Sequence, residues 1–407
     1  MPELSQRILV AEDLRPAYYD DFCCLAADCK LSCCKGWNIT FNKKDYLALK
    51  RQEGSQDLNE RMENGLRRIR KGPMAEQFYG EFNMDSGVCP LLREDGLCQL
   101  QKEKDHGALP RVCRIYPRSE IYLPSGYLER SLSPSCEGVL ALLWDLPNGL
   151  EFRSDSLPKD QQKYVNFPEE NDLPLYFSVV REWCIDQLQN RRFTLPQRIW
   201  IMGIGLKLLT DNEIDIQSWM KRVAALSNSD ILPSLPDGNQ ELGLFLGNCL
   251  HVLLAIQNNN PILRNIKAQL IQCMKTDYHK DIDQTFISLR PYREAKTRFE
   301  KMIEDHDYFM ENLLVTAFFY LHIPHMASKE ALWRSYVSFC NLYAIYRFVS
   351  VMSCREGAAG DRDELFKMIV FASRSLIHNS SRQDQLRDEL FKNDSATLAH
   401  MAILLCG

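Results

Sequence analysis

The chain has 407 residues with 49 basic and 54 acidic side chains, so its formal net charge is −5. This near-balance gives no global attraction to nucleic acid. Apolar residues make up 45% and charged residues 25%, which is typical of a soluble globular protein and excludes wholesale disorder. The longest apolar candidate, residues 244–256, is too short to span a bilayer. We therefore expect neither a nucleic-acid nor a membrane partner.

The first residues lack the apolar core of a signal peptide, because Glu3, Glu12 and Asp13 interrupt it. A chain that is not exported stays in the reducing cytoplasm, where disulfides are rare. Nine of the 15 cysteines lie in residues 1–136, and the total is odd. These observations favour a cytoplasmic protein whose front cysteines are thiols or metal ligands.

In chain order, residues 1–22 resemble a lead-in segment and residues 45–71 have helical character. Residues 85–136 carry many glycines and prolines, which predict loops with little room for regular structure. The basic stretch 61–71 is interrupted by Glu63, and a solvated helix face explains it better than a nucleic-acid site. Residues 1–144 are therefore predicted to form an irregular, cysteine-rich, metal-binding domain.

A polar, proline-containing segment, residues 145–175, predicts a linker. Residues 176–407 show apolar side chains at helical spacing and few alternating strand patterns, so the sequence predicts an all-helical domain here and a mainly α protein overall. The expected helices are 176–188, 197–209, 216–226, 241–256, 262–274, 295–310, 313–323, 330–352, 363–377 and 383–406.

The candidate metal ligands are eight of the front cysteines: Cys24, Cys29, Cys33, Cys34, Cys89, Cys98, Cys113 and Cys136. Soft thiolates bind zinc and iron–sulfur clusters. One tight pair, Cys29-x3-Cys33, is too few for a standard zinc ribbon, and the C-x2-C-x2-C run of a bacterial ferredoxin is absent. Ligation by thiolates without a nearby histidine pair suits an iron–sulfur cluster, with zinc as the alternative. Eight cysteines suffice for two four-ligand centres, or for one centre and four spectators.

The remaining cysteines are interpreted differently. Cys23 stands outside the ordered pattern. The six later ones lie in or beside helical apolar patterns, and burial in the core is the simpler explanation for them. They are Cys184, Cys249, Cys273, Cys340, Cys354 and Cys406.

Five short motifs surround the eight cysteines. They are Phe22-Cys23-Cys24-x4-Cys29-x3-Cys33-Cys34-Lys35-Gly36-Trp37, Cys89-Pro90-Leu91-Leu92, Gly96-Leu97-Cys98, Leu109-Pro110-x2-Cys113-x2-Tyr116-Pro117-Arg118 and Leu132-Ser133-Pro134-Ser135-Cys136. Together they resemble the flagellin lysine-N-methylase (FliB-type) family. The same C-x3-C-C order also marks a broader group of zinc- or iron-chelating proteins. The resemblance covers about residues 18–143; the helical part is similar only in length and character.

The resemblance implies an enzyme that methylates lysine ε-amines of flagellin, with S-adenosylmethionine as donor and an iron–sulfur cluster, of the 4Fe-4S type, on some of the matched cysteines. The residues themselves reveal no donor site. Gly203-Ile204-Gly205 lies within a helical apolar pattern and is better explained by helix packing than by a nucleotide-binding turn. No catalytic base stands out either. The alternative is a non-catalytic metal-binding or redox-sensing interaction protein.

Overall fold

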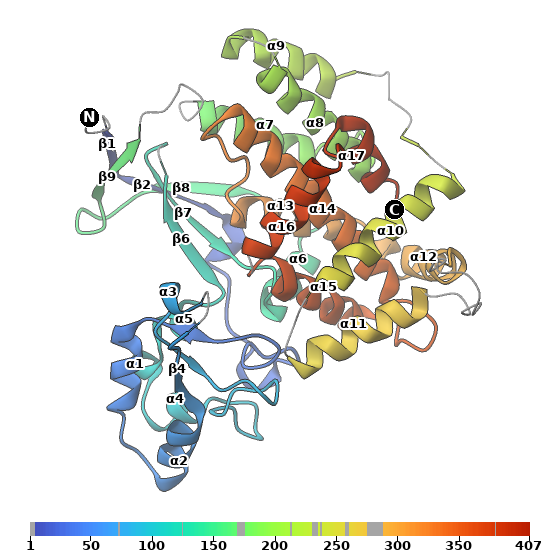
Figure 1. The fold of residues 1–407 in the computed structure, drawn as a ribbon. Helices are drawn as coiled ribbons and strands as arrows, with labels where there is room; N and C mark the ends of the chain where they lie inside the picture. Colours follow the sequence, from blue (N-terminus) through green and yellow to red (C-terminus); the bar gives the residue numbers. More distant parts are fainter. Residues whose placement is uncertain are drawn as a thin grey trace.

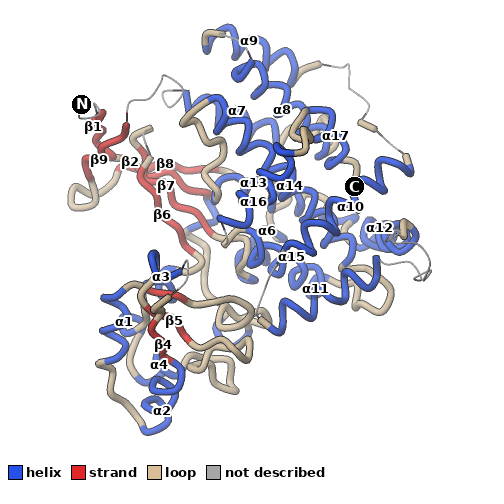
Figure 2. The backbone as a smooth tube through the Cα atoms, viewed as in Figure 1, coloured by secondary structure: helices blue, strands red, loops and turns tan. Residues whose placement is uncertain are grey.

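The computed structural model describes residues 5–71, 74–123, 125–168, 176–211, 214–229, 235–236, 238–256, 260–274, 288–378 and 380–407. The chain is mainly helical, and its strands gather on the N-terminal side of the molecule (Figures 1 and 2). None of the helices in these ranges is long and apolar enough to cross a membrane.

The described strands all come from the first 168 residues. They are β1 (Ser5–Val10), β2 (Glu12–Pro16), β3 (Thr40–Phe41), β4 (Leu66–Arg68), β5 (Gly80–Phe82), β6 (Arg118–Tyr122), β7 (Tyr127–Leu132), β8 (Phe152–Ser156) and β9 (Lys163–Pro168). One sheet has the order β6-β7-β2-β8, in which only the β7–β2 pair is parallel; a small antiparallel sheet has the order β3-β5-β4; and β1 pairs with β9.

Short helices alternate with these strands. They are α1 (Lys43–Lys50), α2 (Gln56–Gly65), α3 (Met74–Gln77), α4 (Gln99–Glu103), α5 (Arg111–Ile115) and α6 (Glu137–Trp144). The prediction of an irregular N-terminal part is therefore wrong. The helical expectation for 45–71 also needs correction, because α2 ends at Gly65 and β4 follows at once. Hydrogen bonds between backbone segments that are distant in sequence order these strands, and local residue preferences do not reveal such pairing.

The segment predicted as a linker contains β8 and β9, which pair with β2 and β1 at the other end of the N-terminal part. Residues 169–175 of that segment lie outside the described residues. The domain boundaries at 144 and 175 stay a prediction.

The C-terminal half confirms the all-helical expectation over the described residues. Its helices are α7 (Phe177–Leu188), α8 (Leu195–Asp211), α9 (Ile216–Ser227), α10 (Asn239–Ala255), α11 (Pro261–Met274), α12 (Arg290–Met302), α13 (Phe309–Tyr320), α14 (Lys329–Met352), α15 (Arg362–Leu376), α16 (Ser380–Lys392) and α17 (Leu398–Leu405). The predicted helix 295–310 ends early, because a short 3-10 turn separates α12 from α13. The predicted helix 383–406 is two helices, since Asp394 has a left-handed φ of 52° that an α-helix does not accommodate.

Side-chain caps define where several of these helices begin. Ser328 accepts a hydrogen bond from the Ala331 amide at the start of α14, and Asp361 accepts one from the Glu364 amide at the start of α15. Such caps satisfy amides that have no partner within the helix. They fix where these two long helices begin, and α15 carries Arg374 to the first cysteine loop.

Two main hydrophobic cores result, beside a small cluster of Val10, Leu128 and Leu157 among the strands. The larger is built around α13 and α14, and it also includes Tyr18, Leu132 and Leu143 from the N-terminal part. The smaller is confined to residues 39–109, the blue-to-teal unit in Figure 1. Cys34, Cys98 and Cys113 pack against this smaller core. The eight cysteines therefore lie on and around the smaller unit, where it faces the helical half.

Candidate metal centre

All eight predicted ligands line one cavity of about 200 Å³. They come from the segments 24–34, 89–98, 113 and 136, which are far apart in sequence. Cys23 is exposed and does not line the cavity. The fold thus brings all eight side chains to the border of one cavity, and their role as metal ligands stays a prediction.

The first loop is held by contacts from both sides. The Glu137 carboxylate accepts hydrogen bonds from the Leu31 amide at 2.7 Å and from the Cys29 thiol at 3.3 Å. The Trp37 indole donates to the Cys33 carbonyl at 2.5 Å. Arg374, at the end of α15, donates to the Leu31 and Lys35 carbonyls, each at 2.7 Å. The loop is therefore tied to the helical half as well as to α6.

Gly36 is needed at the end of this loop. Its φ of +88° lies in the left-handed region, and an added Cβ would stand 3.3 Å from an Arg374 guanidinium nitrogen. Its amide donates to the Gly87 carbonyl at 3.0 Å, just ahead of Cys89. Glycine adopts this conformation without strain. It lets the first two cysteine segments meet.

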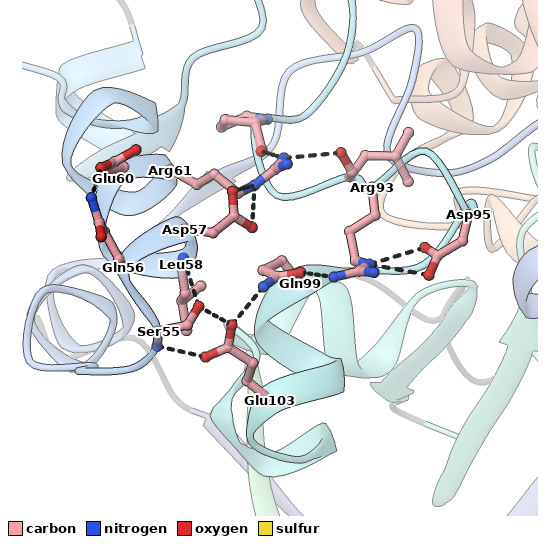
Figure 3. Close-up of polar contacts among 12 residues, drawn as sticks. Ser55, Gln56, Asp57, Leu58, Glu60, Arg61, Arg93, Asp95, Gln99 and Glu103 are labelled. Atoms are coloured by element: carbon pink, nitrogen blue, oxygen red, sulfur yellow. Dashed lines mark hydrogen bonds and ion pairs between the residues drawn. The ribbon is translucent and has the colours of Figure 1, made fainter.

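The second segment, Cys89 to Cys98, is stabilised by a polar network at the base of the smaller unit (Figure 3). Arg61 donates to the Pro90 carbonyl at 2.9 Å and pairs with Asp57. Glu103 accepts from the Gln99 amide group at 2.5 Å and also contacts Ser55. The basic stretch seen in the sequence thus contributes Arg61 to loop positioning, which the sequence did not suggest.

The two segments are also joined by backbone. The Cys89 amide donates to the Cys34 carbonyl at 2.8 Å, and an isolated antiparallel bridge joins Lys35 to Val88. Cys113 lies in α5 and Cys136 is the N-cap of α6. Short helices and tight backbone turns therefore present each sulfur to the cavity.

The thiols form one connected group. Cys33 and Cys34 are hydrogen-bonding partners of each other, and the Cys89 thiol is a second partner of Cys34. Burial raises the pKa of Cys113 well above its ordinary value, and charges on Cys34, Cys33 and Cys98 add to the shift. On the other side, Cys136 interacts through charge with Cys33 and Cys24, and Cys29 with Cys136.

Burial favours the protonated, neutral form of several of these thiols. It raises the pKa of Cys29 to about 12, with the Glu137 carboxylate adding to the shift. Burial likewise raises the pKa of Cys136 to about 11, although the Val139 and Gly138 amides at the start of α6 favour the thiolate. Cys29 and Cys136 are thus neutral thiols at neutral pH, and a bound metal would displace their protons. Within the described residues, no three His, Cys, Asp or Glu side chains are already grouped as a metal site.

Aromatic and polar residues border the cavity. The Trp37 and Tyr116 rings meet edge to face with centroids 4.9 Å apart. His378, just after α15, packs on Trp37 at 4.5 Å, and its Nε2 lies 2.7 Å from the Ser135 hydroxyl. Protein atoms crowd the partly exposed His378 ring; this crowding and the Arg374 charge lower its pKa below the ordinary value. Arg374 and His378 were not found from the sequence, because over 200 residues separate them from the motifs.

The structure also shows how the remaining motif residues are used. Four of the six later cysteines are buried and two are partly buried, in keeping with packing roles. Gly203 and Gly205 lie within α8, where an added Cβ would clash at 2.2 Å with Tyr336 and Trp183 respectively. Close helix packing therefore accounts for both glycines, as the sequence indicated.

Comparison with known protein families shows which family the chain belongs to. Residues 181–404 match the family model described as FliB lysine N-methylase C-terminal domain. The chain belongs to the FliB lysine N-methylase family. This match covers the helical half, where the sequence motifs are silent, and so it is independent of the cysteine pattern. Membership supports a lysine methyltransferase role.

Three Salmonella proteins are similar to the chain in sequence. The Lysine-N-methylase of Salmonella choleraesuis is 31% identical over 301 residues, which is 64% of this chain and 72% of the relative. The Flagellar biosynthetic protein FliU of Salmonella muenchen is 31% identical over 140 residues, covering 33% of this chain and 78% of FliU. The Lysine-N-methylase of Salmonella typhimurium is 31% identical over 166 residues, covering 37% and 39%. No solved structure matches the chain.

Proposed function

We propose that this FliB-family protein methylates lysine ε-amines of flagellin, with S-adenosylmethionine as methyl donor and an iron–sulfur cluster in the cysteine cavity. The observation that carries the proposal is the convergence of eight thiols on one cavity, in a chain whose helical half matches lysine N-methylases. The name of the FliU relative, a flagellar biosynthetic protein, supports flagellin as the substrate.

The donor chemistry of the cavity fits such a cluster. Sulfur dominates the groups able to bind a metal, and thiolates are the usual ligands of iron–sulfur clusters. Cys33 connects the thiols around Cys34 with Cys136, so the eight thiols form one connected group around the cavity. A bound cluster would supply electron storage or Lewis acidity.

The protein must also provide a neutral lysine. A free ε-ammonium has a pKa of about 10.4, and an apolar surrounding lowers it by disfavouring the charge. The Trp37 and Tyr116 rings give the cavity such a wall, and Glu137 provides a carboxylate that can accept a proton. The neutral amine then forms its N–C bond as the S–C bond of the sulfonium breaks, which leaves S-adenosylhomocysteine and releases one proton.

Two measurements test the proposal. Anaerobically purified protein should be brown and contain iron and inorganic sulfide; a colourless protein containing zinc would reject the cluster. Incubation with isotope-labelled S-adenosylmethionine and flagellin should add methyl-sized masses to lysines, as read by mass spectrometry. If the cluster is intact and no such mass shift occurs, the protein is a metal-binding or redox-sensing protein instead of an enzyme.

A further inference from the structure

A chain of hydrogen bonds runs from the cysteine cavity toward the surface of the protein. It begins at Tyr116, which follows α5 and lines the cavity. The Tyr116 hydroxyl lies 3.0 Å from the Ser135 hydroxyl, and the Ser135 Oγ lies 2.7 Å from the His378 Nε2. Ser135 is fully buried, whereas His378 is exposed to solvent. One buried hydroxyl therefore connects a side chain of the cavity with a ring that water reaches.

The neighbours of Ser135 set the direction of these hydrogen bonds. Its Oγ also lies 2.8 Å from the Ser133 hydroxyl, so three polar groups surround it. A hydroxyl donates one hydrogen bond and accepts two, and a ring nitrogen without a proton only accepts. When the Ser135 proton points to the His378 Nε2, the Tyr116 and Ser133 hydroxyls both donate to Ser135, and each of these protons has an acceptor. The Tyr116 oxygen then keeps its lone pairs for a donor in the cavity.

His378 has the properties of a group that passes a proton on. Surrounding protein atoms and the Arg374 charge lower its pKa, so the ring is neutral at neutral pH and does not retain an added proton. The two ring nitrogens are distinct, and one can take up a proton from Ser135 while the other releases one to water. Trp37 packs against the ring with centroids 4.5 Å apart and holds it in place.

The proposed reaction needs a route by which a proton leaves the cavity, because each methyl transfer to an amine releases one. Glu137, the carboxylate on the cavity, is buried and already accepts hydrogen bonds from the Leu31 amide and the Cys29 thiol. A proton placed on Glu137 would still be enclosed by protein. The hydrogen-bonded chain from Tyr116 to His378 leads out to solvent instead.

We propose that Tyr116, Ser135 and His378 form a relay that carries the proton of the substrate amine from the cavity to solvent. This inference rests on the proposed function. The amine proton moves to the Tyr116 oxygen, the phenol proton to the Ser135 Oγ and the Ser135 proton to the His378 Nε2, and the Nδ1 proton then leaves to water. No charge remains on the hydroxyls, and one proton is released for each methyl group transferred. Tyr116 contacts the amine directly, and Ser135 and His378 act through it.

Steady-state methylation of flagellin tests the relay. His378→Ala should lower kcat about tenfold or more and leave the KM for flagellin unchanged, because the ring moves a proton and does not bind flagellin. Free imidazole should restore most of the lost rate, since His378 is exposed and a small base can take its place. Ser135→Ala should show a similar loss without rescue, because it interrupts the chain inside the protein.

His400→Ala is the matched control. His400, on α17, is also exposed, and its Nδ1 lies 2.7 Å from the Thr397 hydroxyl, but it does not line the cysteine cavity. This variant should keep the native kcat and show no response to imidazole. Far-UV circular dichroism and iron content check that each variant is folded and loaded. If Ser135→Ala does not fold, His378→Ala with imidazole decides.

A second readout does not depend on activity. Nitrogen NMR of the cluster-containing protein with isotope-labelled histidine distinguishes ring nitrogens that carry a proton from those that do not, and loss of signals in His378→Gln identifies the ring. The relay requires a neutral His378 with an unprotonated Nε2 at neutral pH. A protonated Nε2 in the resting protein would overturn it.

The outcomes separate the relay from the proposed function. If the native protein methylates flagellin and His378→Ala is equally active, the relay is wrong and the proposed activity stands. The same holds if imidazole does not relieve the loss in His378→Ala. If the native protein transfers no methyl group, the proposed function is rejected together with the relay.

Discussion

The smaller unit and the helical half are stabilised in different ways. The core of the smaller unit has eleven buried apolar residues, and three of the eight cavity cysteines pack directly against it. The larger core contains nearly the whole of α13 and most of α14. A small core supplies little stability and often needs a metal or crosslink, whereas a large one does not. Under the proposed function, the same residue type would act as a ligand around the smaller unit, whereas it packs in the core of the helical half.

The largest effect is expected when one of the cavity cysteines is replaced. Cys113→Ser should lose most of the bound iron and the methyl-transfer activity, because a four-ligand set would be left incomplete. The smaller unit should become open to protease in the same variant. Iron analysis and limited proteolysis measure both effects. Cys340→Ala, at a buried cysteine of α14, is the control and should keep its iron. Unchanged iron in Cys113→Ser would contradict the assignment.

The next effect tests the helical core alone. Phe339 on α14 is fully buried and contacts Phe318 edge to face with ring centroids 5.3 Å apart. Phe339→Ala should lower the free energy of unfolding by about 3–5 kcal/mol, because it leaves a cavity. Denaturant unfolding measures this change. Iron content per folded chain should be unaffected; a parallel loss of iron would show that the two regions are not stabilised independently.

A smaller effect is expected where the two regions meet. Arg374→Ala removes two hydrogen bonds to the carbonyls of the first cysteine loop. Hydrogen bonds to charged groups contribute about 1.5–3 kcal/mol each, or about 3–6 kcal/mol for two. Because Leu31 and Lys35 are partly exposed and their carbonyls can bind water instead, we expect a loss of about 2–4 kcal/mol and a faster release of iron to a chelator. Unfolding curves and the decay of visible absorbance measure this. Arg374→Lys, which can keep one of the two bonds, should be intermediate.

The smallest effect concerns pH at the same border. The folded-state pKa of His378 is lowered, so the folded protein binds its proton less readily than the unfolded chain does. The resulting stabilisation is present above the unfolded pKa of about 6.5 and is lost as the pH falls below it. His378→Gln should therefore flatten the decline in stability below pH 6.5. His400→Gln, at an exposed histidine, should retain the native slope.

The helices of the C-terminal half were predictable because each buries one face, and apolar residues then recur with the helical period. The ends of these helices were harder to predict, because the break between α16 and α17 depends on the single left-handed residue Asp394. The strands of the N-terminal part could not be found, since β2 pairs with β8 over a hundred residues away. Short strands carry too little local pattern to reveal such a partner.

By itself, the sequence determined the mainly helical class and the eight cysteines that belong together, because apolar periodicity and spaced soft ligands are local features. Only the tertiary structure decided which thiols meet, with Cys89 beside Cys34 and Cys33 between Cys34 and Cys136. It alone brought Arg374 to the first cysteine loop and His378 to Ser135. Those arrangements depend on packing between distant segments, and packing leaves no mark on the spacing of residues along the chain.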